Sequence, residues 1–137
     1  PIDRALVWWA RGLAQLALRQ DAEKAMLEAR SAVEEAVKAD TKKAEFLAIA
    51  DLRMGQALSA VGEGDRAHAA LRSALWRQRG LDAANGEYAE YRLYLVRILR
   101  ALGSLPGEEA AREEGRRLAR ALLDRDPLRV EYQIEAR

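Results

Sequence analysis

The sequence predicts an all-α fold of about three antiparallel helical hairpins. Half of the residues are hydrophobic, and Ala and Leu, which favour helices, dominate over the residues that favour strands. Apolar residues recur at helical spacing, and Gly, Pro and Asp residues interrupt them at regular intervals. A chain of 137 residues typically buries roughly two-thirds of the surface of its unfolded form, enough for one core. We therefore expect a single helical domain over residues 1–137.

The helix breakers divide the chain into about six helical segments. We predict these segments over 3–19, 22–39, 42–61, 65–79, 87–102 and 108–125. Taken in pairs they give hairpins over 3–39, 42–79 and 87–125, and residues 127–137 are predicted to begin a further helix. The odd-numbered segments are apolar nearly all round, whereas the even-numbered segments carry charged residues on one face. The first kind is expected to form inner helices and the second kind outer helices.

Glycine residues stand where the predicted hairpins turn. Gly62 is expected to stop the third segment, and Asp65 to cap the fourth. Residues 103–107 are expected to play the same part in the last hairpin, and residues 80–86 to form a longer linker. A hairpin with its linker spans about 40 to 44 residues, a period typical of helix-turn-helix solenoids.

The central hairpin carries residues that match a known repeat. They are Leu52, Met54, Gly55 and Leu58 before the Gly62 turn, and Ala67, Leu71 and Ala74 after it. This pattern resembles the tetratricopeptide repeat (TPR). The resemblance implies a TPR-like, right-handed α-solenoid in which the small residues Gly55, Ala67 and Ala74 let paired helices approach closely. The last hairpin departs from the pattern, because Val96 stands where the repeat usually has Gly.

The length of the repeat indicates one branch of that family. It exceeds the usual length of about 34 residues, and residues 76–82 close an outer helix with the run Trp-Arg-Gln-Arg-Gly-Leu-Asp. In this respect the chain is similar to the helical-repeat sensor arrays of large bacterial transcription activators, as is its segment 122–129. The similarity implies a bacterial regulatory domain that is part of a larger protein. The sequence contains no DNA-reading or nucleotide-binding motif.

The residue inventory argues against catalysis and metal binding. The chain has no Cys, and His68 is its only His, so a catalytic triad or a Cys- or His-ligated metal site lacks partners. The carboxylate pairs at 108–109 and 113–114 stand three or four residues before arginines, the spacing of ion pairs on a helix surface. The Gly-containing turns lack the Lys-Ser/Thr ending of a phosphate loop. We expect no enzyme activity, no catalytic or metal-binding residue and no cofactor.

The charge balance gives no reason to expect nucleic acid or a membrane as the partner. Lys plus Arg number 23 and Asp plus Glu number 22, which leaves a net charge of +1. An arginine series runs through positions 112, 116, 117, 120 and 125, but Glu113 and Glu114 interrupt it and no aromatic residue lies among the arginines. No apolar run reaches the roughly 18 to 20 residues that cross a bilayer. We expect a cytoplasmic protein without direct nucleic-acid or membrane contact.

The function that the predicted fold favours is the binding of a protein or peptide. A stack of helical hairpins exposes its inner helices on a concave surface, where a partner helix or an extended peptide can bury apolar side chains. By the resemblance, the residues facing this surface are Trp9, Leu13, Leu16, Leu52, Gln56, Ser59, Glu90, Arg97 and Arg100. They form a groove that is apolar at its amino end and basic at the other. A partner with apolar anchors followed by an acidic group would suit it.

Two other functions are compatible with the sequence. The first is a small-ligand sensor whose pocket lies between inner helices and includes Tyr91, Tyr94 and Arg97. The second is a scaffold that self-associates into a homo-oligomer. The apolar end of the groove also has a plainer explanation, in which a preceding helix or a second copy of the chain simply covers it.

Overall fold

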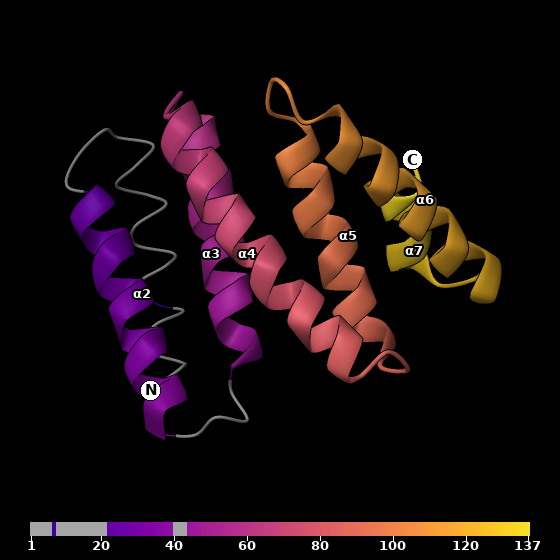
Figure 1. Cartoon of the computed structure of the whole chain (residues 1–137), viewed down its shortest axis with the longest axis horizontal. Helices are drawn as coiled ribbons and strands as arrows, with labels where there is room; N and C mark the ends of the chain where they lie inside the picture. The colour runs from indigo at the N-terminus through magenta and orange to yellow at the C-terminus, as the bar shows by residue number, and fades with distance from the viewer. Residues whose placement is uncertain (1–6, 8–21, 40–43) are drawn as a thin grey trace. The chain divides into compact units, whose positions relative to one another are not determined.

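The computed structural model describes residues 7, 22–39 and 44–137, and their regular structure is entirely α-helical, which confirms the all-α fold class (Figure 1). The predicted segment 3–19 lies outside the described residues except for Val7. The described helices are α2 (Ala22–Ala39), α3 (Glu45–Ala60), α4 (Gly64–Ala84), α5 (Ala89–Gly103), α6 (Glu109–Arg125) and α7 (Val130–Glu135). In the described part of the chain, no helix is both long enough and apolar enough to cross a membrane.

The helix α4 is the element whose end was predicted wrongly. The prediction stopped it at residue 79, before Gly80, but the helix continues to Ala84. An interior Gly costs only about 1 kcal/mol relative to Ala, and the residues after it are compatible with a helix. Asp82 also accepts a hydrogen bond from Arg92 Nε at 3.0 Å, which ties this last turn to α5. The predicted linker 80–86 is therefore mostly helix.

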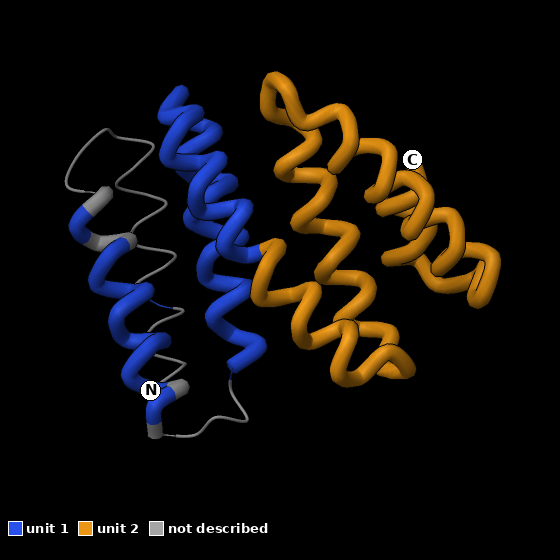
Figure 2. Tube along the Cα trace, in the orientation of Figure 1, with its two compact units in different colours: residues 1–74 blue, residues 75–137 orange. Residues whose placement is uncertain are grey.

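Contacts between Cα atoms group the chain into two compact units, 1–74 and 75–137, with the boundary inside α4 (Figure 2). Unit 1 contains α2, α3 and the first part of α4. Unit 2 contains the rest of α4 together with α5, α6 and α7. The single domain and the stacked hairpins that the sequence predicts stay predictions.

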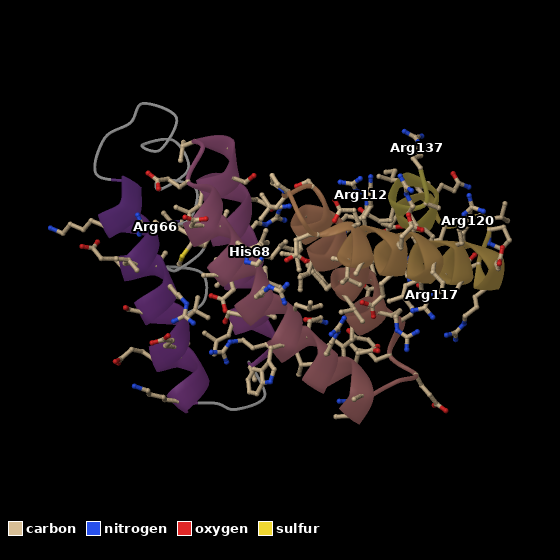
Figure 3. The ribbon with its side chains drawn as sticks, turned by 45° about the horizontal axis from the view of Figure 1, so that its top comes forward. Arg66, His68, Arg112, Arg117, Arg120 and Arg137 are labelled. Carbon is tan, nitrogen blue, oxygen red and sulfur yellow. The ribbon has the colours of Figure 1, made fainter. Side chains whose placement is uncertain are left out.

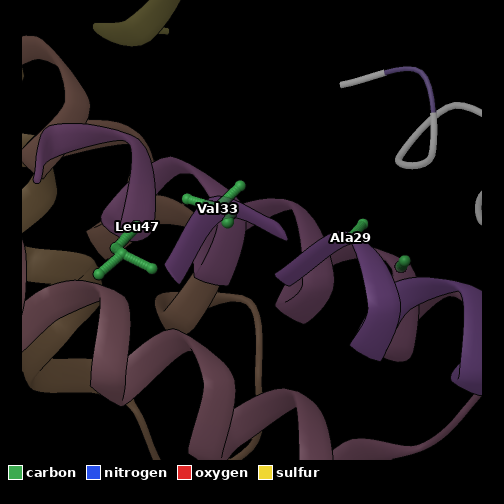
Figure 4. Packing of buried hydrophobic residues seen from close by; sticks show 5 residues of the cluster. Ala29, Val33 and Leu47 are labelled. Carbon is green, nitrogen blue, oxygen red and sulfur yellow. The ribbon is translucent and has the colours of Figure 1, made fainter. Parts of the chain in front are cut away.

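The core of unit 1 forms where α2 packs against α3. Ala29 and Val33 are one helical turn apart on α2, and Leu47, Ala50 and Ala57 follow the buried face of α3 (Figure 4). All five side chains are buried. Burying a Val or Leu side chain contributes about 1.5 to 3 kcal/mol, so this apolar seam stabilises the helix pair.

Gly62 ends α3 as predicted, and its conformation explains why Gly is needed. Its φ of 82° lies in the left-handed region that other residues rarely adopt. The Glu63 amide donates to the Leu58 carbonyl at 2.9 Å, and the Gly62 amide donates to the Ser59 carbonyl at 3.1 Å. These two hydrogen bonds define the Schellman motif, which satisfies carbonyls that the helix end leaves unpaired.

Gly55 allows α3 and α4 to approach closely inside unit 1. A Cβ atom at Gly55 would lie 2.4 Å from Leu71 Cγ. Ala67 and Ala74, on the same helix as Leu71, are fully buried. Small side chains at these positions are therefore a steric requirement of the packing inside unit 1.

The turn between α5 and α6 differs from the prediction in its details. Gly103 is the last residue of α5, but the left-handed residue is Gly107, with a φ of 80°. Gly103 serves close packing, because a Cβ atom there would lie 2.8 Å from Arg112 Cα. Arg112 donates two hydrogen bonds to the Gly103 carbonyl, at 3.0 Å from Nε and 2.8 Å from Nη2. The guanidinium thus caps the end of α5.

Candidate partner-binding surface

The predicted surface residues of the first hairpin, Trp9, Leu13 and Leu16, lie outside the described residues. In unit 1, Leu52 is only 1% exposed, so its side chain belongs to the core and offers nothing to a partner. We remove it from the candidate surface, because burial against the neighbouring helices already uses its apolar area. Gln56 is exposed and accepts a hydrogen bond from Arg53 at 3.2 Å, and Ser59 is half-buried.

In unit 2, the structure brings all three predicted residues of α5 into contact with the end of the chain. Glu90, Arg97 and Arg100 are spaced at seven and three residues, which places them on one side of a helix. Each forms an ion pair with a residue in the segment 129–135. Most of this segment is α7, which packs against both α5 and α6. The predicted basic end of the groove is therefore occupied within the chain itself.

Glu135 is the acidic group at this surface. Its carboxylate lies 3.4 Å from Arg97 Nε and 2.9 Å from Arg100 Nη1, and its side chain is only 12% exposed. Arg100 also donates to the Ile134 carbonyl at 3.3 Å, near the carboxyl end of α7. Two guanidinium groups thus share one carboxylate, and one of them also contacts the helix end, where cations are favoured.

Tyr132 is the apolar anchor of α7. Its side chain is 3% exposed and packs with Leu93 and Val96 of α5 and with Ala119 and Leu122 of α6. Its hydroxyl accepts a hydrogen bond from Arg129 Nη1 at 3.0 Å, so the polar end of the buried ring has a partner. Burial of the ring and pairing of its hydroxyl together fix where α7 docks.

Arg129 forms the third contact, with Glu90 at the opposite end of the surface. Hydrogen bonding to Glu90 raises the pKa of Arg129 above its already high value, so this guanidinium stays charged at neutral pH. The guanidinium also lies 4.7 Å from the centre of the Tyr132 ring, a cation–π distance. The neighbouring carboxyl of Glu131 has a lowered pKa. The larger cause is a hydrogen bond with its own backbone amide, and the smaller cause is the positive charge of Arg129.

The three contacts repeat along the chain at intervals of three residues. Arg129, Tyr132 and Glu135 meet an acidic residue, an apolar cluster and a pair of arginines, in the order in which these follow along the α5 face. A helix of six residues is far below the roughly 12 to 15 that make an isolated helix stable, so α7 depends on these contacts for its structure. The segment 129–135 docks on a surface that we call the α5–α6 surface. It comprises Glu90, Leu93, Val96, Arg97 and Arg100 of α5 and Ala119 and Leu122 of α6.

The residues of the predicted small-ligand pocket are only partly brought together. The Arg97 guanidinium lies 5.2 Å from the centre of the Tyr94 ring. The Tyr91 ring instead meets Tyr88 edge-on, with ring centres 4.7 Å apart, and the Tyr91 carbonyl accepts a hydrogen bond from Gln78 at 2.8 Å. Tyr94 and Arg97 are thus neighbours, while Tyr91 contributes to the packing of α5 against α4.

A buried polar cluster in unit 1 was missed by sequence reasoning. Asp51 lies on α3 with a side chain that is 2% exposed. It accepts hydrogen bonds of 2.8 Å from Arg30 Nε of α2 and from Ser73 Oγ of α4. The one signal in the sequence is an acidic residue inside an otherwise apolar inner helix. The contacts join three helices, which indicates a role in holding them together.

The charged residues in and just before α6 follow the prediction only in part. Glu113 and Arg116 form the predicted surface ion pair, 3.2 Å apart. Glu114 instead reaches Arg79 of α4 at 2.5 Å. Glu108, predicted to lie on a solvated face, is buried at the start of α6, and that expectation was wrong. Figure 3 shows Arg112, Arg117 and Arg120 along α6.

Neither metal-type geometry nor similarity to known proteins identifies a function. Among residues 7, 22–39 and 44–137, no cluster of three or more His, Asp and Glu side chains could hold a metal ion. Comparison of the chain with protein families, with curated proteins and with solved structures finds no match. The features of the described residues that bear on function are the contacts of α7 with α5 and α6.

Proposed function

We propose that the chain is a protein-binding module, without enzyme activity, whose α5–α6 surface recognises a short helical segment of a protein partner. The observation that carries the proposal is the docking of α7, in which Tyr132 is buried and Glu135 pairs with Arg97 and Arg100. The surface therefore has the shape and charge to hold a helix with an aromatic anchor followed, three residues later, by a carboxylate. This is the helix-in-groove type of peptide recognition.

The same proposal includes the finer fold that the sequence predicts. We propose that the helices stack as a TPR-like, right-handed solenoid, and that the module serves as the regulatory arm of a larger bacterial protein in the cytoplasm. The close approach of α3 and α4 at Gly55 supports the repeat assignment, because such an approach requires a small residue at this position.

The strength of the contacts sets the affinity that a partner needs. A buried aromatic anchor typically contributes about 2 kcal/mol or more, whereas a partly exposed ion pair contributes roughly 0 to 1 kcal/mol. The chain's own α7 competes with any partner, and a short tether typically gives an effective concentration in the millimolar range. A partner segment that makes no more contacts than α7 can displace it only near millimolar concentration, so tighter binding favours a longer helix.

A peptide-display selection tests the proposal. The bait is the full chain carrying Glu135→Lys, which drives α7 from the surface by placing a third positive charge beside Arg97 and Arg100. Counter-selection uses the same bait with Arg97→Glu and Arg100→Glu added. We expect recovered peptides to carry an aromatic residue with Asp or Glu three positions later, and we expect the counter-selection bait to reject them.

A matched control separates a specific surface from general charge effects. Arg116 is an exposed arginine on α6 that pairs with Glu113 and lies outside the surface contacted by α7. Baits carrying Arg116→Glu should retain the selected peptides. Recovery of no motif, or of motifs that the Arg97→Glu, Arg100→Glu bait binds equally well, would overturn the proposal.

A further inference from the structure

We infer that the α5–α6 surface of one copy of this chain takes α7 from a second copy, so that the chain self-associates by exchanging this helix. The inference rests on the proposed function, because it names a partner for the same surface. A second copy is a partner whose fit is already visible, since every copy carries Arg129, Tyr132 and Glu135. Exchange of an identical element creates no new contact chemistry, which makes it a low-cost route to a dimer.

The segment that joins α6 to α7 is suited to opening. Asp126 follows α6 with a non-helical backbone, at φ −145° and ψ 80°. Pro127 prevents α6 from running on into α7, because it lacks an amide proton and disfavours a helical conformation in the residue before it. The turn is closed by a hydrogen bond of 3.2 Å from the Arg129 amide to the Asp126 carbonyl. When the turn opens, residues 126–129 can span at most roughly 13 Å.

Breaking the ion pairs that hold α7 is expected to cost only a modest free energy. Arg97 and Arg100 are 31% and 42% exposed, so water can solvate both guanidinium groups as soon as Glu135 leaves. Tyr132 is the one large side chain of α7 that leaves a buried position. The same contacts re-form when α7 of a second copy docks. Only the open state, in which α7 is undocked, is without these contacts.

The exposed face around α7 provides an independent observation. Leu128 is 87% exposed, Val130 is 61% exposed and Ile134 is 46% exposed, so three large apolar side chains face water within seven residues. Such single side chains are ordinary on a protein surface, but a group of three is a candidate interface. In an exchanged dimer the two connecting segments run past each other near the two-fold axis. Leu128 and Val130 of one copy can then pack against those of the other.

Concentration decides between the closed monomer and the exchanged dimer. The tether favours docking of α7 within its own chain at low protein concentration, because its effective concentration is typically millimolar. Exchange is therefore expected to grow as the protein concentration approaches that range. The apparent mass of the wild-type chain should rise from 15.3 kDa towards twice that value across a dilution series measured by light scattering.

Two complementary variants of the full chain test the inference. The first, Tyr132→Ala with Glu135→Lys, keeps the surface but has a defective α7. The second, Arg97→Glu with Arg100→Glu, has an intact α7 but a defective surface. Each variant alone should stay a monomer at concentrations where the wild type associates. A mixture should form a one-to-one complex of twice the mass, in which the first variant holds α7 of the second.

A synthetic peptide of residues 126–137 separates failure of the inference from failure of the proposed function. Binding of the peptide to the first variant, together with a complex in the mixture, supports both. Peptide binding without any complex, and with a wild type that stays monomeric at all concentrations, overturns the exchange and leaves the surface standing. A folded first variant that does not bind the peptide overturns both. Should circular dichroism show that the first variant is unfolded, Glu135→Lys alone takes its place.

Discussion

The two units place their charged groups in different surroundings. In unit 1, Asp51 is 2% exposed and holds Arg30 and Ser73 across three helices. In unit 2, Glu135 is bound by Arg97 and Arg100, whose side chains are about a third or more exposed, and it belongs to a helix of six residues. Both clusters combine a carboxylate with arginine, but the arginines of the second are more exposed to water than Arg30 of the first.

This difference matches a structural role for the cluster of unit 1 and the binding role that we propose for the surface of unit 2. A buried carboxylate cannot lose its partners cheaply, because the groups left behind stay away from water and keep an unpaired charge or polar atom. An ion pair whose arginines are partly exposed can exchange a partner for water at a smaller cost. Buried charge therefore fixes the helices of unit 1, while the more exposed ion pairs of unit 2 suit the reversible contact that we propose for the α5–α6 surface.

The largest effect is expected from removing Asp51. Asp51→Ala leaves Arg30 and Ser73 without their shared acceptor, and we expect the free energy of unfolding to fall by about 3 kcal/mol. Native-state hydrogen exchange should show the loss of protection concentrated in α2 and α3. Urea denaturation, monitored by circular dichroism, measures the total fall in the free energy of unfolding.

Asp51→Asn is the matched control, because it keeps the size of the side chain and one carbonyl acceptor. Its cost should be clearly smaller than that of Asp51→Ala. A change below about 1 kcal/mol for Asp51→Ala would show that the cluster is not a structural tie, and the contrast between the units would be lost.

The second largest effect concerns the close approach of α5 and α6. Gly103→Ala would place a Cβ atom 2.8 Å from Arg112 Cα, and since this neighbour is backbone the helices must separate. Overpacking of this kind costs roughly 1 to 3 kcal/mol, and we expect about 2 kcal/mol in thermal denaturation.

Gly80→Ala is the control for the same substitution in unit 2. No atom lies within 4 Å of a Cβ built at Gly80, and this residue lies inside α4. The Ala variant should be more stable by up to about 1 kcal/mol, because Ala favours a helix. Equal effects at the two positions would mean that helix propensity, and not packing, governs both.

The sequence predicts the local structure of this chain well because the local signals agree with one another. Apolar spacing defines α2, α3, α5 and α6, and the Gly62 turn forms with the expected left-handed residue. The end of α4 was missed because a single Gly is a weak helix breaker when helix formers follow it. Gly103 was assigned to a turn because its role is a close contact with the backbone of Arg112 on the next helix. Such a contact depends on how two helices pack and leaves no local signal in the sequence.

The candidate site could be predicted in its charges but not in its occupant. The positions of Arg97 and Arg100 led to the expectation of an acidic partner group, and Glu135 has that chemistry. The apolar anchors were expected at Trp9, Leu13 and Leu16, which lie outside the described residues. No local pattern indicates that the segment 129–135 folds back onto α5, because the pairings join residues 35 or more positions apart. The burial of Leu52 was missed because an inner helix that is apolar all round does not reveal which side is covered.

A smaller effect is expected at the anchor of α7. Removal of a core aromatic residue usually costs about 3 to 5 kcal/mol. Tyr132→Ala should cost only about 1 to 2 kcal/mol, because α7 can leave as a unit and the loss cannot exceed its docking free energy. Amide exchange in residues 130–135 should become fast while α5 and α6 stay protected. A loss as large as that of Asp51→Ala would show that α7 is part of the core.

Tyr132→Phe is the conservative partner of that variant. It keeps the buried ring and removes only the hydroxyl that accepts from Arg129. Amide protection of α7 should be retained, with a change in the free energy of docking of about 1 kcal/mol or less. Loss of docking in the Phe variant would mean that the Arg129 contact, rather than burial of the ring, holds the helix.

The smallest expected effect is the pH response of Glu131, at the start of α7. The folded structure lowers the pKa of this carboxyl below its ordinary value of 4.5, through its backbone amide and then through Arg129. A lowered pKa means that the stabilisation is complete above pH 4.5 and is lost as the pH falls through the folded pKa. An NMR titration should place the Glu131 midpoint below 4.5, and Arg129→Gln should move it part of the way back. A midpoint at or above 4.5 would mean that residues 129–131 do not form this turn in solution, and with it the contrast between a fixed unit 1 and a reversibly docked α7 would lose its structural basis.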